Sequence, residues 1–269
     1  RPMHKLDVDG AIATRQVRHS IRPSLNLDFA NSKELDSRIT FYRDSIATYY
    51  DSKGVLKYAN VNEPRFDHDP LTGESKGLLI EEARANSNEY SIPFFGWSGN
   101  SAYISPNQAI APDGTYSAVM LHDTESATSV FHGAYRGGRT VVNGTSYTIS
   151  GYFKAGTESS IGFRLYDGAN MVCRATFNLS AGTSNLINGT SIGISPVGNG
   201  WYHCYITGTG TNNTTSGDIY VFTTTVYTHT SVGDNSIYMW GIQMEQGAFP
   251  TSYIPSDTRF TSRASTATY

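Results

Sequence analysis

Residues 66–82, FDHDPLTGESKGLLIEE, bring together side chains that could bind a metal ion or transfer protons. Asp67 and Asp69 flank His68, so in an extended chain the two carboxylates share a face while the imidazole points away. Carboxylate oxygens are ligands that calcium prefers, but the spacing does not match an EF-hand loop and an ion would need further ligands from elsewhere. Calcium is therefore one possibility for this stretch, and no other cofactor is expected.

The same residues also fit a tight turn. Asp69 precedes Pro70 and is restricted to extended conformations. Pro70 suits the second position of a turn, and Gly73 can adopt a positive φ. The side chains of Asp67 and Thr72 can bond back to nearby amides. Because turn chemistry accounts for every residue, we predict a Pro/Gly corner that leads into a strand.

Two glutamates, Glu81 and Glu82, close the stretch and point to opposite faces of the predicted strand. If Glu81 is buried, its charge must be offset by a partner, for which Arg38 or Arg43 is the most plausible choice. Two catalytic carboxylates of a glycosidase are the alternative, and these would stand roughly 5 to 9.5 Å apart across a cleft.

The sequence contains no familiar catalytic motif. It has no GxSxG elbow, HExxH pair, P-loop or dinucleotide fingerprint. The string GAYRGGRT, residues 133–140, lacks the lysine of a phosphate loop and is interpreted as a hairpin loop in which Tyr135 and Arg136 could face a ligand. His122 and Asp123 resemble half of a catalytic dyad without a nucleophile, and we interpret them as a strand end. None of these stretches therefore gives a recognisable catalytic signature.

Sugar binding needs exposed aromatic rings, because sugars stack their apolar faces on them while amides and charged groups bond the hydroxyls. Trp97 and Tyr103 lie in an irregular Gly/Ser/Asn-rich stretch and are the rings most expected to be exposed. A competing interpretation has Trp97 covering one end of the fold. Trp201 and Trp240 lie within predicted strands and are assigned to the core. The candidate glycan-binding residues are Trp97, Tyr103, Tyr135 and Arg136.

The elements that must position these residues are short strands. Ten to twelve runs rich in β-branched and aromatic residues are bounded by Gly, Asn, Asp or Pro, which predicts an all-β, antiparallel jelly-roll sandwich. In residues 147–154, Tyr147, Ile149 and Phe153 alternate with polar neighbours and define one face. Strict alternation through residues 237–244 would put Ile237 and Met239 on one face of the strand and Ile242 and Met244 on the other. Both faces would then be covered by other parts of the fold.

Composition excludes several classes of partner. The 269-residue chain has a formal charge of −3, which gives no electrostatic reason to expect nucleic acid. It has no apolar run long enough for a membrane helix. Cys173 and Cys204 show no metal-binding spacing and are predicted to be buried free thiols rather than a disulfide. Residues 1–35 are polar and weakly periodic and predict an extended arm, followed by the sandwich at 36–256 and a tail at 257–269.

Five segments, in order, resemble those of a family of bacteriophage virion proteins. They are ITFYRDSIATYYDSKGVLKYANVNEPRFDHDPLTGESKGLLIEEARAN (39–86), APDGTYSA (111–118), YTISGYFKAG (147–156), GWYHCYI (200–206) and IYMWGIQMEQGAFPTSYIPS (237–256). The family carries a concanavalin-like or carbohydrate-binding-module-like jelly roll and is found in tail fibres, spikes and head appendages. Residues 1–35 fall outside the resemblance.

The resemblance implies a structural protein of the virion that is not an enzyme and is made in the cytoplasm of a bacterial host. Its expected role is adhesion to host-surface carbohydrate on a fibre or spike. The alternative is a capsid decoration protein whose arm clamps neighbouring capsid subunits, and a polysaccharide-trimming enzyme comes third. The expected partners are other virion proteins, contacted through residues 1–35, and further copies of the chain, with a homotrimer the expected assembly.

Overall fold

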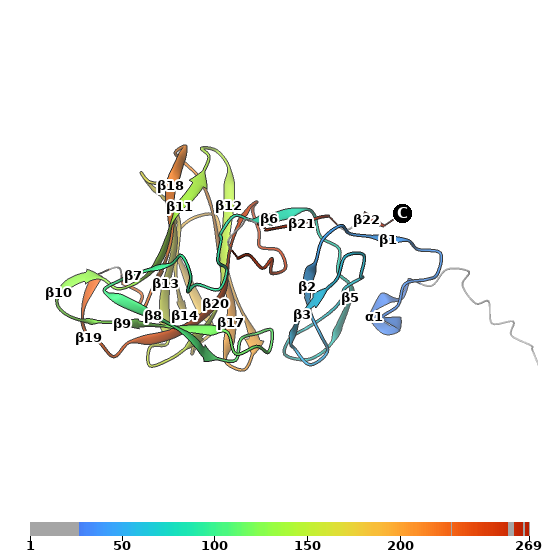
Figure 1. The fold of residues 1–269 in the computed structure, drawn as a ribbon, viewed down its shortest axis with the longest axis horizontal. Helices are drawn as coiled ribbons and strands as arrows, with labels where there is room; N and C mark the ends of the chain where they lie inside the picture. The colour runs from blue at the N-terminus through green and yellow to red at the C-terminus, as the bar shows by residue number, and fades with distance from the viewer. Residues whose placement is uncertain (1–26, 227, 258–260, 266, 269) are drawn as a thin grey trace, which may run out of the picture.

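The computed structural model describes residues 27–226, 228–257, 261–265 and 267–268. Its main body consists of two six-stranded antiparallel sheets packed face to face (Figure 1). In spatial order, the first sheet contains β15 (Thr183–Asn188), β14 (Met171–Asn178), β13 (Ser160–Tyr166), β18 (Thr214–Phe222), β11 (Gly133–Val141) and β7 (Ser98–Asn100). The second contains β16 (Ser191–Gly198), β17 (Trp201–Thr209), β12 (Ser146–Ala155), β20 (Ser236–Gln246), β9 (Ala118–Asp123) and β8 (Ala102–Ala109). The predicted all-β jelly-roll sandwich is confirmed.

Apolar side chains from the inner faces of both sheets form one continuous core. Phe163, Leu165 and Val221 of the first sheet pack with Ile149 and Phe153 of the second, all without measurable exposure. The alternation predicted for residues 147–154 is confirmed, because Tyr147, Ile149 and Phe153 all belong to this core. Cys173 and Cys204 are buried free thiols, as expected, and burial raises the pKa of Cys173 to about 12.

The prediction that strand β20 is covered on both faces is confirmed, but strict alternation through it is wrong. Ile237, Met239, Ile242 and Met244 all lie in the core between the sheets. The register against β12 shifts by one residue here, and Gly241 adopts a φ of +62°. Such a β-bulge places two residues of one strand opposite one of its neighbour, so the faces exchange beyond it.

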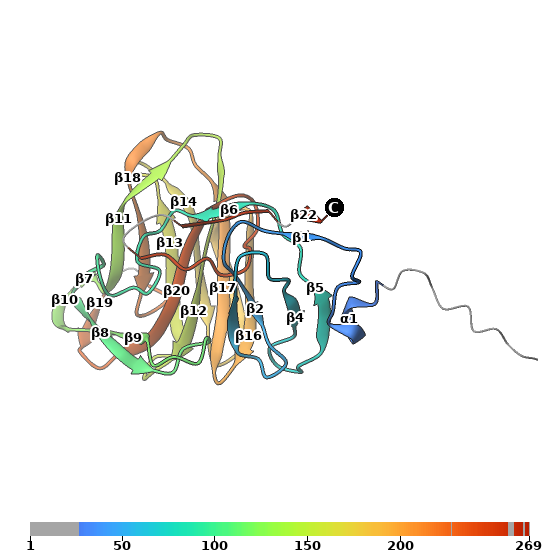
Figure 2. The same ribbon diagram turned by 45° about the vertical axis from the view of Figure 1, so that its right-hand side comes forward.

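A cap of two small hairpins covers the outer face of the second sheet (Figures 1 and 2). It is built from β2 (Ala47–Tyr50), β3 (Leu56–Ala59), β4 (Phe66–His68) and β5 (Ser75–Leu78). Beneath it lies a second apolar cluster that contains Leu56 of the cap with Tyr152, Trp201, Trp240 and Tyr253. The indole of Trp240 donates to the Ser117 hydroxyl at 3.0 Å, so its buried N–H has a partner. Trp201 and Trp240 are therefore buried, as predicted.

The corner predicted at residues 69–73 joins β4 to β5 in the cap. The Asp69 carboxylate accepts the amides of Leu71 and Thr72, and the Gly73 amide donates to the Asp69 carbonyl. Gly73 has the expected positive φ, +70°. Asp67 accepts the Tyr50 amide at 2.8 Å. The Asp69 carboxylate thus stabilises the turn, and the Asp67 carboxylate joins the β4–β5 hairpin to β2 of the other hairpin.

A buried ion cluster ties the cap to the end of the chain. The Arg65 guanidinium, which has no exposed surface, lies 2.7 Å from the Glu81 carboxylate, and Arg263 lies 3.3 Å from the same oxygen. Burial acts to raise the pKa of Glu81, but the charges of Arg263 and Arg65 and the hydrogen bonds from Ser252 outweigh it and hold the pKa below its ordinary value. Glu81 thus has arginine partners, but not those predicted. Arg43 bonds to backbone carbonyls, and Arg38 pairs with Asp36.

Three two-stranded ribbons complete the described fold. β10 (Glu125–Phe131) pairs with β19 (Thr228–Val232), β6 (Arg84–Asn86) with β21 (Thr261–Arg263), and β1 (Phe41–Tyr42) with β22 (Ala267–Thr268). The short helix α1 (Phe29–Ser32) precedes them and lies beside β5. Within the described residues, no helix is long and apolar enough to cross a membrane.

Candidate functional site

The outer face of the first sheet carries a set of aromatic and charged side chains. Alternation along β11, β13, β14 and β18 sends their core residues inward and every second residue outward. The cap lies over the second sheet (Figure 1), whereas this face is met by the β10–β19 ribbon, whose Phe131 ring lies 6.2 Å from that of Tyr220 and 6.3 Å from that of Phe222. The outward set is Phe131, Tyr135, Arg164, Tyr166, Arg174, Asp218, Tyr220 and Phe222.

Five rings of this set form an aromatic stripe across the strands, made by Phe131, Tyr135, Tyr166, Tyr220 and Phe222. Tyr220 stacks on Tyr135, with centroids 5.7 Å apart and planes at 16°, and on Phe222 at 4.2 Å and 14°. A Cβ on Gly133 would come within 2.6 Å of the Tyr220 ring, so glycine makes room for that ring. Tyr220 and Phe222 are buried by their neighbours, whereas Phe131, Tyr135 and Tyr166 keep exposed surface.

The charged groups of this face lie among the rings. The Arg164 guanidinium lies 5.1 Å from the Tyr220 centroid and 5.5 Å from that of Tyr166, and it is 3.2 Å from the Asp218 carboxylate. Arg174 is its partner in register on β14. Burial raises the pKa of Asp218, although the charge of Arg164 opposes the shift. Two cations and one carboxylate therefore share a partly exposed surface.

Such a surface can bind a polar ligand that also has apolar faces. Rings offer a flat apolar contact, and guanidinium and carboxylate groups bond hydroxyls with fixed geometry. The stacked arrangement holds the rings in place before a ligand arrives, which lowers the entropy cost of binding. The chemistry available here is recognition, because no nucleophile paired with a base is among these residues.

The structure brings only one of the four candidate residues into this stripe, Tyr135. Arg136 follows it in β11 and points to the other face, where it bonds to Glu89. Tyr103 is 53% exposed, as predicted, but it lies on β8 of the second sheet and stacks on His122 at 4.6 Å. The candidate set therefore does not form one site.

The prediction that Trp97 is an exposed ring is wrong. Its side chain is 7% exposed and belongs to the core between the sheets. The indole N–H donates to the Tyr90 carbonyl at 3.1 Å. The competing interpretation, in which this ring closes one end of the sandwich, agrees with its burial. A ring enclosed in this way offers no face to a sugar.

A cleft of about 610 Å³ lies between the cap and the second sheet. Its walls include Asp67, Glu81, Tyr152 and His203. Burial lowers the pKa of His203 to about 4 and raises the pKa of Asp67. Glu81 is fully engaged by Arg65, Arg263 and Ser252, so it is an anchor for the cap and not a group ready to give or take a proton. Asp69 also lies in the wall, where its carboxylate accepts the amides of Leu71 and Thr72 in the turn.

Sequence reasoning missed most of the aromatic stripe and a cluster of Asp123, His132 and His229. The signal for the stripe was present, because Tyr166, Tyr220 and Phe222 alternate with core residues in their strands. Which of the two sheets is covered could not be read from that pattern. His132 lies nine positions after Asp123 but His229 lies 106 positions after it, and this spacing matches no metal-binding motif.

A scan against protein-family models found no match, and neither did a search of curated proteins. Among solved structures, the enzymatically active domain of tailspike protein 4 from bacteriophage CBA120 matches with a TM-score of 0.38 and 12% identity, over 60% of this chain and 21% of that chain. The CBM22-1 and GH10 modules of xylanase 10B from Clostridium thermocellum match at 0.37 and 12%, over 65% and 30% of the two chains. TmCBM61 bound to β-1,4-galactotriose matches at 0.35 and 12%, over 60% and 99%. At these scores the likenesses are distant and carry no weight for function.

Proposed function

We propose that the protein is a non-enzymatic carbohydrate-binding module and that a glycan binds on the outer face of the first sheet. The observation that carries this proposal is the partly exposed stripe of Phe131, Tyr135 and Tyr166 beside Arg164 and Asp218. Stacking surfaces beside hydrogen-bonding groups are what a sugar requires.

A sheet face suits an extended polysaccharide chain better than a single small sugar. The outward residues follow four neighbouring strands from Arg174 on β14 to Tyr135 on β11. Neighbouring strands lie about 4.8 Å apart, so the set extends over roughly 14 Å. The cleft beneath the cap is less favourable, because its walls include groups already engaged in holding the cap.

The binding test is a glycan array probed with the intact protein and with Tyr166→Ala. We expect the wild type to bind a defined subset of polysaccharides and the variant to bind them about tenfold more weakly, because a stacking ring is lost. Tyr103→Ala is the matched control, since it removes an exposed tyrosine from the other sheet. The proposal would be contradicted if the wild type bound no glycan on the array, or if both variants lost the same amount of binding.

We further propose that the module is displayed on a bacteriophage virion as an adhesin. The support is the resemblance of five sequence segments in order, and the predicted arm of residues 1–35 would supply the attachment. Most of that arm, residues 1–26, lies outside the described residues. Capsid decoration is the alternative, in which the arm clamps capsid subunits and sugar binding is incidental.

Locating the protein in intact particles separates the two placements. Cryo-electron microscopy of virions that carry the protein should place it on a fibre or spike. Contacts between residues 1–35 and the capsid lattice would overturn the adhesin proposal and favour decoration. Incubation with a bound polysaccharide should leave the polymer length unchanged, and shortening would contradict a non-enzymatic role.

A further inference from the structure

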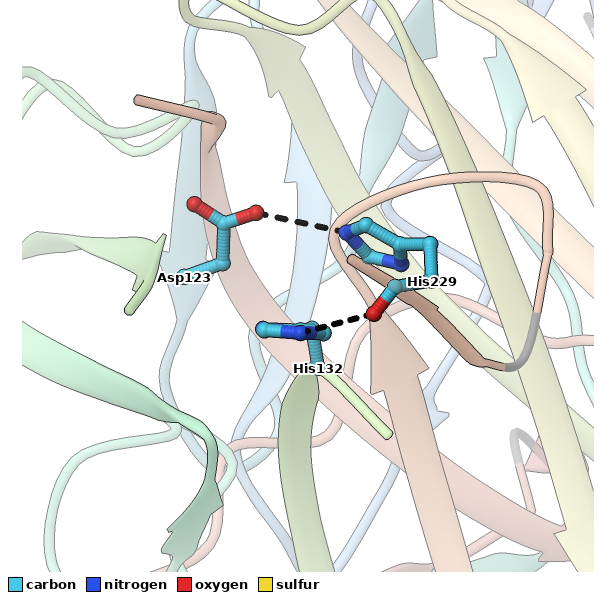
Figure 3. Close-up of side chains that lie close together, drawn as sticks. All are labelled: Asp123, His132 and His229. Atoms are coloured by element: carbon cyan, nitrogen blue, oxygen red, sulfur yellow. Dashed lines mark hydrogen bonds and ion pairs between the residues drawn. The ribbon is translucent and has the colours of Figure 1, made fainter. Parts of the chain in front are cut away.

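Three side chains capable of binding a metal meet where the first and second sheets join the β10–β19 ribbon (Figure 3). Asp123 ends β9, His132 lies between β10 and β11, and His229 lies in β19. One potential ligand atom from each lies within 4.8 Å of the other two. The group is outside the proposed sugar-binding face, and nothing in the turns or strand pairing requires two histidines here.

His132 is the first reason to regard the group as a site. Its side chain has no exposed surface, and both ring nitrogens face carbonyl oxygens, Nδ1 at 2.8 Å from Ser101 O and Nε2 at 3.2 Å from His229 O. Carbonyls only accept hydrogen bonds and a neutral imidazole has one N–H, so only one of these contacts can be a hydrogen bond. The shorter contact places the proton on Nδ1. Nε2 then directs a lone pair into the cluster, as in a metal-binding histidine whose other nitrogen donates to a carbonyl.

Asp123 is the second reason. Its carboxylate is buried and accepts hydrogen bonds from Ser231 Oγ and Asn235 Nδ2, both at 2.7 Å, and from the Asn235 amide at 3.0 Å. A carboxylate has about four acceptor positions, and these donors occupy three. Ser231 and the Asn235 side chain both donate to Oδ2, so the open position is on Oδ1. His229 Nε2 lies 3.4 Å from Oδ2, where a bound ion would take the place of one of those two donors. Burial acts to raise the pKa of Asp123, but these bonds outweigh it and keep the group ionised.

We propose that Asp123, His132 and His229 bind a divalent transition metal of the zinc type. Two imidazoles and one carboxylate form a ligand set that suits zinc, whereas calcium takes oxygen ligands. With bonds of about 2.0 Å, tetrahedral ligands stand about 3.3 Å apart. The His229 and Asp123 atoms, at 3.4 Å, already have that spacing, and His132 completes the site by leaving its contact with the His229 carbonyl.

A groove lies next to two residues that hold the cluster. The groove has a volume of about 400 Å³, and Ser231 and Asn235, which hold Asp123, form part of its wall. Because the three protein ligands belong to β9, the β10–β11 junction and β19, the metal joins segments more than 90 residues apart and fixes the β10–β19 ribbon to the sandwich.

The test is a zinc titration of the full chain after it has been stripped with a chelator. Calorimetry should give one zinc ion per chain, and saturating zinc should raise the melting temperature by about 5 °C. Co²⁺ in place of zinc should give the visible absorption of a tetrahedral site. His229→Ala, which removes a ligand at the edge of the cluster, should weaken binding more than tenfold.

Two further variants keep the test decisive if a ligand variant folds poorly. Ser231→Ala leaves all three ligands and should weaken zinc binding about tenfold, because it removes a bond that orients Asp123. His122→Ala removes the neighbouring histidine, which stacks on Tyr103, and should bind zinc as tightly as the wild type.

The competing state is a metal-free cluster in which His132 is an imidazolium that donates to both carbonyls. If that state holds, nitrogen NMR would show two N–H groups on the His132 ring even in the presence of zinc. That result, a stoichiometry well below one, or tight binding by His229→Ala would overturn the metal site. A single N–H on the His132 ring, at Nδ1, together with a zinc-induced shift at both histidines would support it.

Discussion

The two sheets of the sandwich bury similar inner faces, yet their outer faces differ. On the second sheet, Tyr152, Trp201 and Trp240 are sealed beneath the cap. On the first sheet, Tyr135 and Tyr166 remain partly exposed beside charged groups. Aromatic residues therefore occur on both outer faces, and what distinguishes the faces is whether another part of the chain covers them.

The covered rings contribute mainly to the stability of the fold, whereas the exposed rings are available for binding a ligand. A ring beneath the cap contributes its full burial to folding, because water is excluded from both sides of it. A partly exposed ring of the aromatic stripe, such as Tyr135 or Tyr166, contributes less to folding and keeps area for a ligand. Large exposed apolar patches on soluble proteins usually have a binding role. We expect substitutions on the two faces to have different consequences.

The largest effect is expected for Trp240→Ala beneath the cap. Removal of a buried tryptophan leaves a cavity and should lower the free energy of unfolding by about 4 kcal/mol. Tyr166→Ala on the other face should lower it by less than about 1 kcal/mol. Denaturant unfolding of both variants measures the contrast. Similar losses in the two variants would mean that the outer faces are equivalent in the folded protein.

The next effect concerns the attachment of the cap. Glu81→Gln removes the carboxylate that faces Arg65 and Arg263 and should cost about 3 kcal/mol, because two buried guanidinium groups lose their counter-charge. Glu82→Gln is the matched control, since the exposed neighbour pairs with Arg84 and its loss should cost less than about 0.5 kcal/mol. Denaturant unfolding is again the measurement. Equal stabilities of the two variants would show that the cluster does not anchor the cap.

The smallest effect is a pH dependence from His203, which packs against Tyr152 under the cap. Burial lowers its pKa to about 4, whereas the unfolded chain takes up the proton near pH 6.5. The unfolded state therefore binds more protons between these values, and stability should fall as the pH drops from 6.5 to 4. Above pH 6.5 the residue adds no pH dependence.

His203→Gln tests this contribution. The melting temperature of the variant should depend less on pH across that window than that of the wild type. Unchanged dependence would assign the acid sensitivity to other groups of the covered face, such as Glu81. Tyr103→Ala, outside the cap, should leave the pH profile of the wild type intact.

Much of the fold could be predicted from local sequence. The corner at residues 69–73 follows from Asp69, Pro70 and Gly73, whose preferences agree with one another. The faces of β12 follow from its uninterrupted alternation. In each case neighbours within a few residues decide the structure.

The features that could not be predicted depend on contacts between residues far apart in the sequence. Glu81 is neutralised by Arg263, which is 182 positions later in the chain, and no local pattern connects the two. The Gly, Ser and Asn residues around Trp97 are compatible with an exposed ring or with one that covers an end of the fold, and only the packing of the two sheets decides that it is buried. The stripe could not be singled out because the cap, which covers the other sheet, is itself formed by the first part of the chain.

The bulge in β20 has a consequence for how this strand can vary between related sequences. Without Gly241, residues 236–245 alternate perfectly between the core and the cap, so the glycine is in effect an insertion. Deleting it would keep every other side chain on its present face. Alanine in its place would need a φ of +62° and put a Cβ 2.9 Å from the Tyr152 ring. In homologous chains, Gly241 should therefore be deleted more readily than it is replaced by another residue.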